Sequence, residues 1–312
     1  MTGRVVVFNN IVAPYMNRLY NRLADEEPGF AVVSAASTEP NRAWGEIAPS
    51  RFEHVVLPGF RLRLGPGRFA YLNRGIFATL NRLKPRLLVI NGFYPSMVLA
   101  TLWAMLTRTP LMLAIDGWAE TMPNSLYHRI IRPFVLRRCR AVITCGLKGR
   151  DYFLSQGFTA AQIQVVPLVP AWDPPPSLPS LAARPYDLLW CGHLNNEVKN
   201  ARFLVDLCAA LRPSLPALRV RIVGQGPAEA ETLTWLRDLG IDVTHDGALP
   251  WDRMGEVFSA ARLFVFPSLW EPWGLVCNEA MQCGTPVLSS PHVGAGDDLV
   301  LPGRTGAVLP LD

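Results

Sequence analysis

The sequence predicts an α/β protein built from two doubly wound, Rossmann-like domains that face a cleft. Three observations lead to this prediction. The chain has 312 residues, more than one hydrophobic core usually holds. Short apolar runs alternate with amphipathic segments, which is typical of parallel sheets covered by helices. A proline-rich stretch then divides these runs into two sets, so we expect domains at residues 1–172 and 186–312 joined by a linker at 173–185.

The apolar runs give the expected buried strands of each domain. In the first half these are residues 4–10, 30–37, 87–93, 111–115, 141–145 and 163–168, and in the second half 186–192, 219–224, 241–245, 262–268 and 286–290. The linker carries Pro174-Pro175-Pro176 and Pro179, which exclude a helix or a central strand there.

The stretch from Pro267 to Ala280 places two glutamates, Glu271 and Glu279, eight residues apart across a strand-to-helix turn. A helix that begins at Gly274 leaves its first amides unpaired, and such amides can bind a phosphate or sugar oxygen. We expect Glu271 to accept hydrogen bonds from hydroxyls of a sugar and Glu279 from those of a ribose. Taken alone, the pair could equally be a helix-start acid and a solvated helix residue.

The surroundings of this pair resemble the signature of the retaining GT-B glycosyltransferases of family four, the nucleotide-sugar-dependent glycosyl transferases of group 1. A proline-serine strand end precedes the glutamates, an aromatic-glycine-leucine lies between them, and a Gly-x-Pro-Val strand follows at residues 284–287. The resemblance implies closing helices beyond residues 306–309. Because the sequence stops at Asp312, we expect that these helices are missing and that the donor domain is truncated.

The resemblance also implies the roles of single residues. Catalysis falls to Glu271 and Lys199, with Asp116 as a further candidate that either acts near the reacting sugar or caps the next segment. His193 stands where the family has arginine, and it lacks the permanent charge of arginine. We therefore expect Lys199 to supply more of the positive charge that binds the donor diphosphate. The alternative is that His193 is a structural loop residue. The implied donor-binding residues are Glu279, His193, Gly192, Gly224, Gly226, Trp273, Gly274, Leu275, Val276 and Leu249.

The sequence gives fewer signals for the residues of the first domain that bind the acceptor. Asn10 and Tyr15 follow the first expected strand, at the edge where doubly wound sheets bind ligands. No Gly-x-Gly-x-x-Gly occurs there, which counts against a dehydrogenase.

Charge is unevenly distributed, with a net +10 in residues 1–176 and −5 in the remainder. The basic residues from Arg61 to Arg86 are interleaved with apolar ones, a pattern that can bind an anionic membrane surface; the alternative is a solvated helix face. No nucleic-acid-binding motif accompanies the charge, so nucleic acid is not an expected partner. The cluster comprises Arg61, Arg63, Arg68, Arg74, Arg82, Lys84 and Arg86.

Several features place the protein in the cytoplasm, with a peripheral position at the inner face of the plasma membrane. The apolar helix expected at residues 96–106 is too short to span a bilayer. The N-terminus leads directly into a strand without a signal-peptide pattern. The six cysteines form no Cys-x-x-Cys pair, so we expect reduced thiols and no metal site.

The predicted function is retaining transfer of a sugar from a nucleotide-sugar donor to a hydroxyl of a glycan or lipid-linked acceptor, in bacterial surface polysaccharide synthesis. No cofactor and no metal is expected, because the protein supplies the positive charge. Three alternatives stay open: a catalytically silent subunit that binds nucleotide sugar or membrane, a sugar-nucleotide epimerase, and a glycoside hydrolase, whose two carboxylates would flank one bond.

Overall fold

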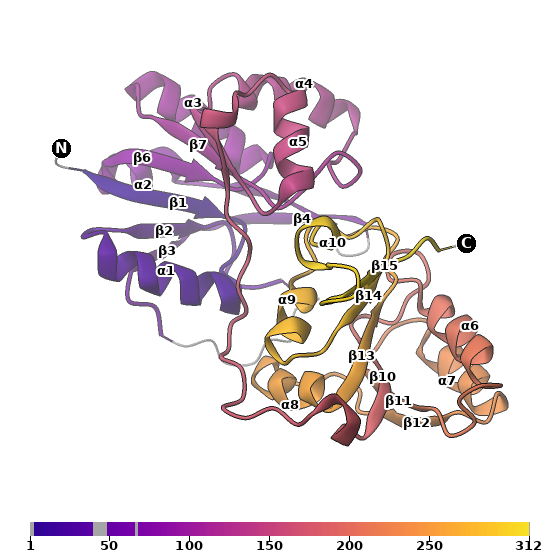
Figure 1. Cartoon of the computed structure of the whole chain (residues 1–312). Helices are drawn as coiled ribbons and strands as arrows, with labels where there is room; N and C mark the ends of the chain where they lie inside the picture. Colours follow the sequence, from indigo (N-terminus) through magenta and orange to yellow (C-terminus); the bar gives the residue numbers. More distant parts are fainter. Residues whose placement is uncertain (1–2, 40–48, 66–67, 312) are drawn as a thin grey trace. The chain divides into compact units, whose positions relative to one another are not determined.

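A computed structural model describes residues 3–39, 49–65 and 68–311 of the chain. The chain forms two compact units, each with its own parallel sheet (Figure 1). Unit 1 comprises Met1–Asp116, Met122–Cys145 and Gly149–Pro167, and unit 2 comprises Gly117–Thr121, Gly146–Lys148 and Leu168–Asp312. Two short segments from the first half of the sequence therefore pack with unit 2. The domain limits 1–172 and 186–312, with the linker 173–185, stay predictions.

The main sheet of unit 1 has seven parallel strands among the described residues, in the order β3-β2-β1-β6-β7-β8-β9. Every first-half strand expected from the sequence is present, although most are a few residues shorter. The strands are β1 (Arg4–Asn9), β2 (Ala31–Ser34), β3 (Glu53–Val56), β6 (Pro85–Ile90), β7 (Leu111–Ala114), β8 (Ala141–Thr144) and β9 (Ile163–Val165).

Successive residues of β1 enter different cores, as strand geometry requires. Val6 and Phe8 belong to a large cluster that also includes residues of α2, α3, α4 and α5. Val7 belongs to a smaller cluster with residues of α1. The sheet is thus covered on both faces. The helices are α1 (Pro14–Glu26), α2 (Ile76–Leu83), α3 (Pro95–Thr107), α4 (Leu126–Leu136), α5 (Leu147–Ser155) and the 3₁₀ turn η1 (Ala160–Gln162).

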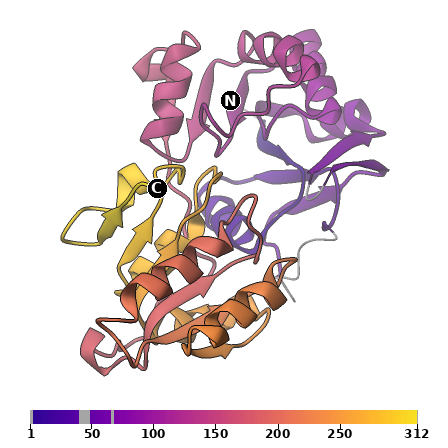
Figure 2. The same ribbon diagram turned by 90° about the vertical axis from the view of Figure 1, so that its right-hand side faces the viewer.

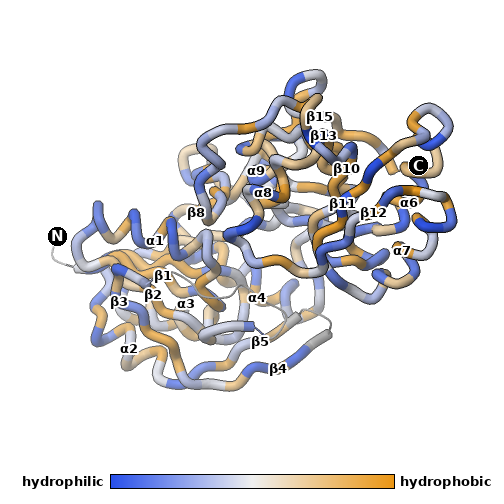
Figure 3. Tube along the Cα trace, turned by 90° about the horizontal axis from the view of Figure 1, so that it is seen from below, coloured by the Kyte–Doolittle hydropathy of each residue, from blue (hydrophilic) through white to orange (hydrophobic). Residues whose placement is uncertain are grey.

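The basic segment of unit 1 is an antiparallel hairpin followed by a helix. β4 (Gly59–Gly65) pairs with β5 (Arg68–Asn73), and α2 comes after them. The helix-face alternative is therefore wrong for the first part of this segment. Arginine and apolar residues alternate with period two along β4, which is a strand pattern, and Figure 3 shows this alternation. Residues 66–67, at the tip, lie outside the described part of the chain.

Unit 2 has a six-stranded parallel sheet within the described residues, in the order β12-β11-β10-β13-β14-β15. All second-half strands expected from the sequence are present. In Figure 2, α6 and α7 lie in front of this sheet, and their apolar residues share a core with β10 and β11. The strands are β10 (Tyr186–Cys191), β11 (Arg219–Val223), β12 (Asp242–His245), β13 (Ala261–Phe266), β14 (Val287–Ser289) and β15 (Gly306–Val308).

The helices of unit 2 also follow the expected pattern. The helix expected near residues 251–260 is a 3₁₀ turn continued by α8. The prediction that the linker contains no helix is wrong at one place, because the 3₁₀ turn η2 forms after Pro179, where no proline interrupts it. The helical elements are η2 (Leu181–Ala183), α6 (Ala201–Leu211), α7 (Glu229–Asp238), η3 (Trp251–Arg253), α8 (Met254–Ser259), α9 (Leu275–Gln282) and α10 (Gly296–Leu299).

Each sheet changes direction of winding at one place, between β1 and β6 in unit 1 and between β10 and β13 in unit 2. At such a switch point the connections leave to opposite faces, so the carboxyl ends of the two strands open a crevice in which ligands bind. The topology of unit 2 therefore directs attention to the loops that follow β10 and β13.

Candidate functional site

The switch point of unit 2 brings together two of the expected catalytic residues. Lys199, from the loop after β10, forms an ion pair with Glu271, from the loop after β13. The Lys199 ammonium also lies 5.0 Å from the ring centroid of Phe266, at the end of β13. Both charged side chains are mostly buried. A cation and an anion that are shielded from water attract strongly, so each holds the other in place.

Local sequence fixes the position of Lys199. The side chain of Asn195 accepts hydrogen bonds from the amides of Val198 and Lys199 at 2.9 and 2.8 Å. This turn, in which an Asn side chain satisfies nearby backbone amides, is a frequent use of that residue. The carbonyl of Val198 then accepts from the amide of Leu269 at 2.8 Å, which ties the two loops together.

The backbone of Glu271 is held on both sides by the loop after β14. Its amide donates to the carbonyl of His292 at 3.2 Å, and its carbonyl accepts from the amide of Gly294 at 3.1 Å. Glu271 and Val293 form an isolated parallel bridge. The direction of the Glu271 side chain therefore depends on residues 292–294.

Helix α9 starts directly after this loop, with Gly274 as its N-cap at φ 94°. A Cβ atom there would approach Phe266 to 2.9 Å, so glycine is required both by φ and by space. The amides of Leu275 and Val276 have no acceptor among the described residues. Trp273, also expected to contribute an amide, is buried, and its indole donates to Asn278 at 2.9 Å. Free amides and the helix dipole together favour an anion here.

Glu279 lies in the second turn of α9, and burial raises its pKa to about 7, while a hydrogen bond from Trp172 Nε1 at 3.3 Å opposes that rise. A buried carboxyl with its pKa near neutrality is a candidate functional residue, which agrees with the role in donor binding that the sequence predicts for Glu279. The side chain can accept hydrogen bonds from a diol once it is ionised.

A buried thiol, Cys277, and a partly buried one, Cys191, lie near the charged groups of the site. Burial raises the pKa of the Cys277 thiol, Glu271 raises it further, Lys199 opposes the rise, and Glu279 adds to it. Cys191, on β10, has its pKa raised to about 12 by burial and by Glu279. The Cys277 thiol is therefore within electrostatic reach of Lys199, Glu271 and Glu279.

The expected glycines serve the packing of loops as well as access for a ligand. A Cβ at Gly224 would lie 1.9 Å from the carbonyl oxygen of Gly192, and one at Gly226 would lie 2.1 Å from that of Leu194. At Gly192 itself, with φ 150°, no atom lies within 4 Å of the position that a Cβ would take. The amide of Gly224 donates to Gly247 at 2.6 Å. Gly192 is thus the glycine with open space beside it.

Two expected donor-binding residues lie apart from the ion pair. His193 is exposed, and its side chain forms no hydrogen bond or ion pair with the residues that the structure describes. Leu249 is partly buried in the loop after β12. Their roles in binding stay predictions.

The acceptor-side candidates belong to unit 1. Asn10 donates to Glu39 at 3.1 Å, and Glu39 also accepts from the buried Tyr71 hydroxyl. Tyr15 is partly buried at the start of α1, and Asp116 is exposed after β7. Asp116 remains a catalytic candidate without a tested role.

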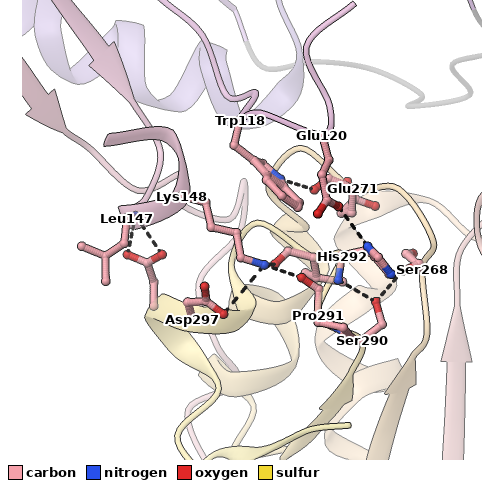
Figure 4. Close-up of polar contacts among 12 residues, drawn as sticks. Trp118, Glu120, Leu147, Lys148, Ser268, Glu271, Ser290, Pro291, His292 and Asp297 are labelled. Carbon is pink, nitrogen blue, oxygen red and sulfur yellow. Dashed lines mark hydrogen bonds and ion pairs between the residues drawn. The ribbon is translucent and has the colours of Figure 1, made fainter. Parts of the chain in front are cut away.

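Sequence reasoning missed three residues, two that touch predicted site residues and one that contacts the loop beside Glu271. Trp118 donates from its indole to the carbonyl of Glu271 at 3.1 Å, and Lys148 donates to two carbonyls of the loop that holds Glu271 (Figure 4). Trp172 contacts Glu279. Of the three, only Trp172 could have been noticed in the sequence, as an aromatic residue in a proline-rich stretch. Trp118 and Lys148 lie far from Glu271 in the sequence.

Within the described residues there is no group of three or more potential metal-ligating side chains, and none of the six cysteines forms a disulfide there. In the same part of the chain, no helix combines the length and apolarity needed to cross a membrane.

Family models match both halves of the chain. Residues 12–168 match the model described as "Glycosyl transferase 4-like domain". Residues 185–312 match the model described as "Glycosyl transferases group 1". The first match alone spans half of the chain, and the second contains the Lys199–Glu271 pair and α9.

Curated relatives align with part of the chain. The alpha-maltose-1-phosphate synthase of Mycolicibacterium smegmatis is 37% identical over 109 residues, which cover 34% of this chain and 25% of the relative. The D-inositol 3-phosphate glycosyltransferase of an Arthrobacter species is 32% identical over 130 residues, which cover 40% and 30%. The chain thus spans less than a third of the length of these relatives.

Solved structures match nearly the whole chain. HepE of Anabaena, in complex with UDP and glucose, has a TM-score of 0.72 at 17% identity and covers 99% of this chain and 86% of that one. The sucrose-phosphate synthase of Thermosynechococcus elongatus has a TM-score of 0.69 at 20% identity, with coverage of 99% and 86%. At these identities the likeness concerns the fold, and it confirms the predicted GT-B architecture.

Proposed function

Because this chain belongs to the glycosyl transferase family of the 4-like and group 1 domains, we propose that it transfers a sugar from a nucleotide-sugar donor to an acceptor hydroxyl. The observation that carries the proposal is the Lys199–Glu271 pair beside the free amides of Leu275 and Val276. This arrangement offers a cation, main-chain donors and a carboxylate within one switch-point crevice, which suits a sugar attached to a diphosphate.

The chemistry follows from where charge develops. When the bond between the sugar and phosphate breaks, the sugar becomes cation-like and negative charge grows on the departing diphosphate. Lys199 and the α9 amides would stabilise that charge, and such preorganised stabilisation is usually the largest catalytic contribution. Glu271 would hold hydroxyls of the sugar, and Glu279 those of the ribose. The departing phosphate would take the proton of the acceptor hydroxyl.

We propose that the transfer retains the anomeric configuration and needs neither metal nor cofactor. An NMR spectrum of the purified glycoside product, compared with that of the donor, tests retention: an inverted anomeric centre contradicts it. Assays with and without EDTA test the metal. Equal rates are expected, because Lys199 and the amides provide the positive charge, and a loss of activity that Mg²⁺ or Mn²⁺ restores would contradict this part.

The donor can be found without knowing the acceptor. HepE, which has the same fold, was solved with UDP and with UDP-glucose, so a panel of nucleotide sugars led by UDP-glucose is the natural start. One member should raise the melting temperature of the wild type, and Glu279→Ala should abolish the shift. A shift that persists in both Glu279→Ala and Lys199→Ala would remove the assignment of the site.

Product analysis separates the alternative activities. Incubation with the selected donor and no acceptor should leave the donor largely intact. Release of free sugar at the transfer rate would indicate a hydrolase, and a changed sugar on the nucleotide would indicate an epimerase. The exposed His193, in place of arginine, favours one further candidate, a catalytically silent subunit that binds donor without turnover. A His193→Arg variant that gains activity would support that candidate.

The acceptor is proposed to be a glycan or a lipid-linked saccharide of a bacterial surface polysaccharide, met at the inner face of the plasma membrane. The outer face of the hairpin β4–β5 carries apolar side chains that water reaches, since Phe60, Leu62 and Leu72 are 59%, 59% and 48% exposed. Such a face flanked by arginines suits an anionic bilayer.

Charge on the hairpin supports the same partner. No acidic residue occurs in the sequence between Glu53 and Asp116. Arg63 and Arg74 form no ion pair with the described residues, and Arg74 lies over the ring of Phe60 at 5.3 Å. Vesicles with anionic lipid should therefore bind the protein in flotation, whereas neutral vesicles should not.

A paired substitution sharpens the vesicle experiment. Phe60→Ser with Leu62→Ser should abolish binding to anionic vesicles, and Leu106→Ser, at an exposed apolar position on α3, is the matched control. If the control lowers binding as much as the pair does, the hairpin is not the binding surface.

A further inference from the structure

We propose that Lys148 and Trp118 are positioning residues for Glu271: they hold the main chain on which its carboxylate is carried. The inference rests on the proposed contact of Glu271 with the donor sugar. Neither residue belongs to the family signature described above, and both come from short segments, 146–148 and 117–121, that pack with unit 2.

The Lys148 ammonium is the centre of a contact network (Figure 4). It donates to the carbonyl of Pro291 and, at 3.1 Å, to that of Val293, and it lies 3.7 Å from a carboxylate oxygen of Asp297. It also lies 4.5 Å from the centroid of the Trp118 ring. The side chain is 15% exposed, so its charge is largely shielded from water and is compensated by these partners. With its donors occupied, the lysine is engaged by the protein rather than free for a ligand.

Trp118 connects this lysine directly to Glu271. Its indole Nε1–H donates to the Glu271 carbonyl at 3.1 Å, and its ring receives the Lys148 ammonium. The ring is buried, and the turn from Trp118 to Thr121 is closed by hydrogen bonds through the Thr121 hydroxyl at 2.8 and 3.1 Å. The indole is therefore presented from a fixed turn.

The two residues act on two paired loops, Lys148 on the loop after β14 and Trp118 on the loop after β13. Glu271 shares a parallel bridge with Val293 and accepts a hydrogen bond from Gly294. Lys148 fixes the carbonyls of Pro291 and Val293, and Trp118 fixes the carbonyl of Glu271 itself. Neither contact involves the Glu271 carboxylate, which is left to Lys199 and, in the proposed function, to the donor sugar. A catalytic geometry depends on such supporting contacts, since small misplacements lower rates strongly.

A neighbouring pair on the same loop gives the control. His292 Nδ1 lies 2.9 Å from Glu120 Oε2, and the two side chains are 40% and 55% exposed. Exposed pairs of this kind contribute little. Glu120→Gln should therefore leave the loop and the activity as in the wild type, whereas Lys148→Met and Trp118→Phe should not. The phenylalanine variant keeps most of the ring and removes the N–H.

Hydrogen exchange of the free protein tests the positioning directly. In Lys148→Met and in Trp118→Phe, the amides of Glu271 and Gly294 should exchange about tenfold faster or more, with α6 unchanged. Lys148→Arg, which can still donate to two carbonyls, should recover part of the protection. Wild-type exchange in both Lys148→Met and Trp118→Phe would overturn the proposal, whichever donor the enzyme uses.

Binding of UDP and UDP-glucose supplies the second readout. Because Glu271 is proposed to contact the sugar, both variants should raise the Kd of UDP-glucose about tenfold while that of UDP changes less than twofold, and should lower kcat. Glu271→Gln is the reference. If Glu271→Gln itself leaves UDP-glucose binding and kcat unchanged, the proposed function of the site fails; if only Lys148→Met and Trp118→Phe leave them unchanged, the positioning role alone fails.

Discussion

The two sheets have the same kind of switch point but different chemistry there. In unit 2, the strand ends around β10 and β13 carry the buried Lys199–Glu271 pair. In unit 1, β1 ends with Asn9, whose amide donates to the Tyr20 hydroxyl at 2.6 Å, and Asn10 contacts Glu39. Topology therefore determines where a crevice forms, whereas the side chains at the strand ends decide what it can bind.

The difference in chemistry is also a difference in charge. Burial raises the pKa of Tyr20 to about 12, so its hydroxyl stays neutral over the physiological range. The Tyr71 hydroxyl is buried and bonded to Glu39, and burial is the main cause that raises its pKa. Unit 1 thus offers neutral hydroxyls, amides and the carboxyl group of Glu39 near its strand ends. Unit 2 offers a cation and helix amides, which suit a phosphate.

The largest effect on activity is expected when the cation of unit 2, Lys199, is removed. In Lys199→Ala we expect kcat to fall by at least about a hundredfold, or roughly 3 kcal/mol, because charge on the departing phosphate loses its partner. Steady-state kinetics with the selected donor measure the effect. Arg253→Ala, on an exposed pair with Glu256, is the control. A kcat within threefold of the wild type would place the catalytic cation elsewhere.

The close approach of two loops in unit 2 should be nearly as sensitive. Gly224→Ala would place a Cβ 1.9 Å from the Gly192 carbonyl oxygen at φ 129°, so we expect a loss of about 2–4 kcal/mol in the free energy of unfolding. Gly303→Ala also has a positive φ but no atom within 4 Å, and strain alone should cost about 1 kcal/mol. Denaturant titration compares the two variants, and equal losses would show that contact between the loops is unimportant.

The pKa of Glu279 makes unit 2 sensitive to pH. An acid whose pKa rises from 4.5 to about 7 on folding stabilises the folded state below pH 4.5 and loses that contribution as pH rises through 7, with a limit of about 3 kcal/mol. Because the ionised form accepts hydrogen bonds from the ribose, the affinity for UDP-glucose should rise about tenfold between pH 6 and 8.

Calorimetric titrations across this pH range test the expectation. UDP-glucose is a suitable probe because its diphosphate is esterified at both ends and does not titrate there. Glu279→Gln should bind weakly and without pH dependence. A wild-type affinity that is constant from pH 6 to 8 would mean that Glu279 is ionised throughout or does not contact the donor.

The smallest effect is expected in unit 1. Tyr71→Phe removes one hydrogen bond to the buried Glu39 and leaves that from Asn10, so the free energy of unfolding should fall by about 1–2 kcal/mol. Binding of UDP-glucose should be unchanged, because the proposed donor site is in unit 2. Thermal unfolding and calorimetry check both statements. Weaker donor binding in this variant would contradict the proposal that unit 2 alone binds the donor.

The parts of the fold that were predictable have local signals. Strands of five or six apolar residues, and the helix that starts at Gly274, could be located because period, glycine and proline act within a few residues. The glycosyltransferase family was recognisable for the same reason, since Glu271, Glu279 and the strand after them lie in one short stretch. The short strand β3 was missed because polar Glu53 and His54 interrupt its apolar pattern.

The remaining parts of the candidate site depend on contacts between distant residues. Lys148 and Trp118 are separated from Glu271 by more than a hundred residues, and nothing near them in sequence indicates where their donors point. The hairpin β4–β5 was not predicted, and a helix face was kept as an alternative for it, because its basic and apolar residues were considered as a composition rather than as a period-two pattern. Contacts between such distant residues can be predicted only when the order of the strands in each sheet is known.

The thiols of Cys191 and Cys277 lie near the proposed donor site, Cys277 fully buried and Cys191 partly buried. Thiolate is the species that alkylating agents and oxidants attack, and burial together with nearby carboxylates keeps both sulfurs protonated. Two sulfurs beside the proposed site therefore resist oxidation. Here they should react with maleimide or peroxide only when the surrounding loops open. The rate of labelling therefore measures the rate of that opening.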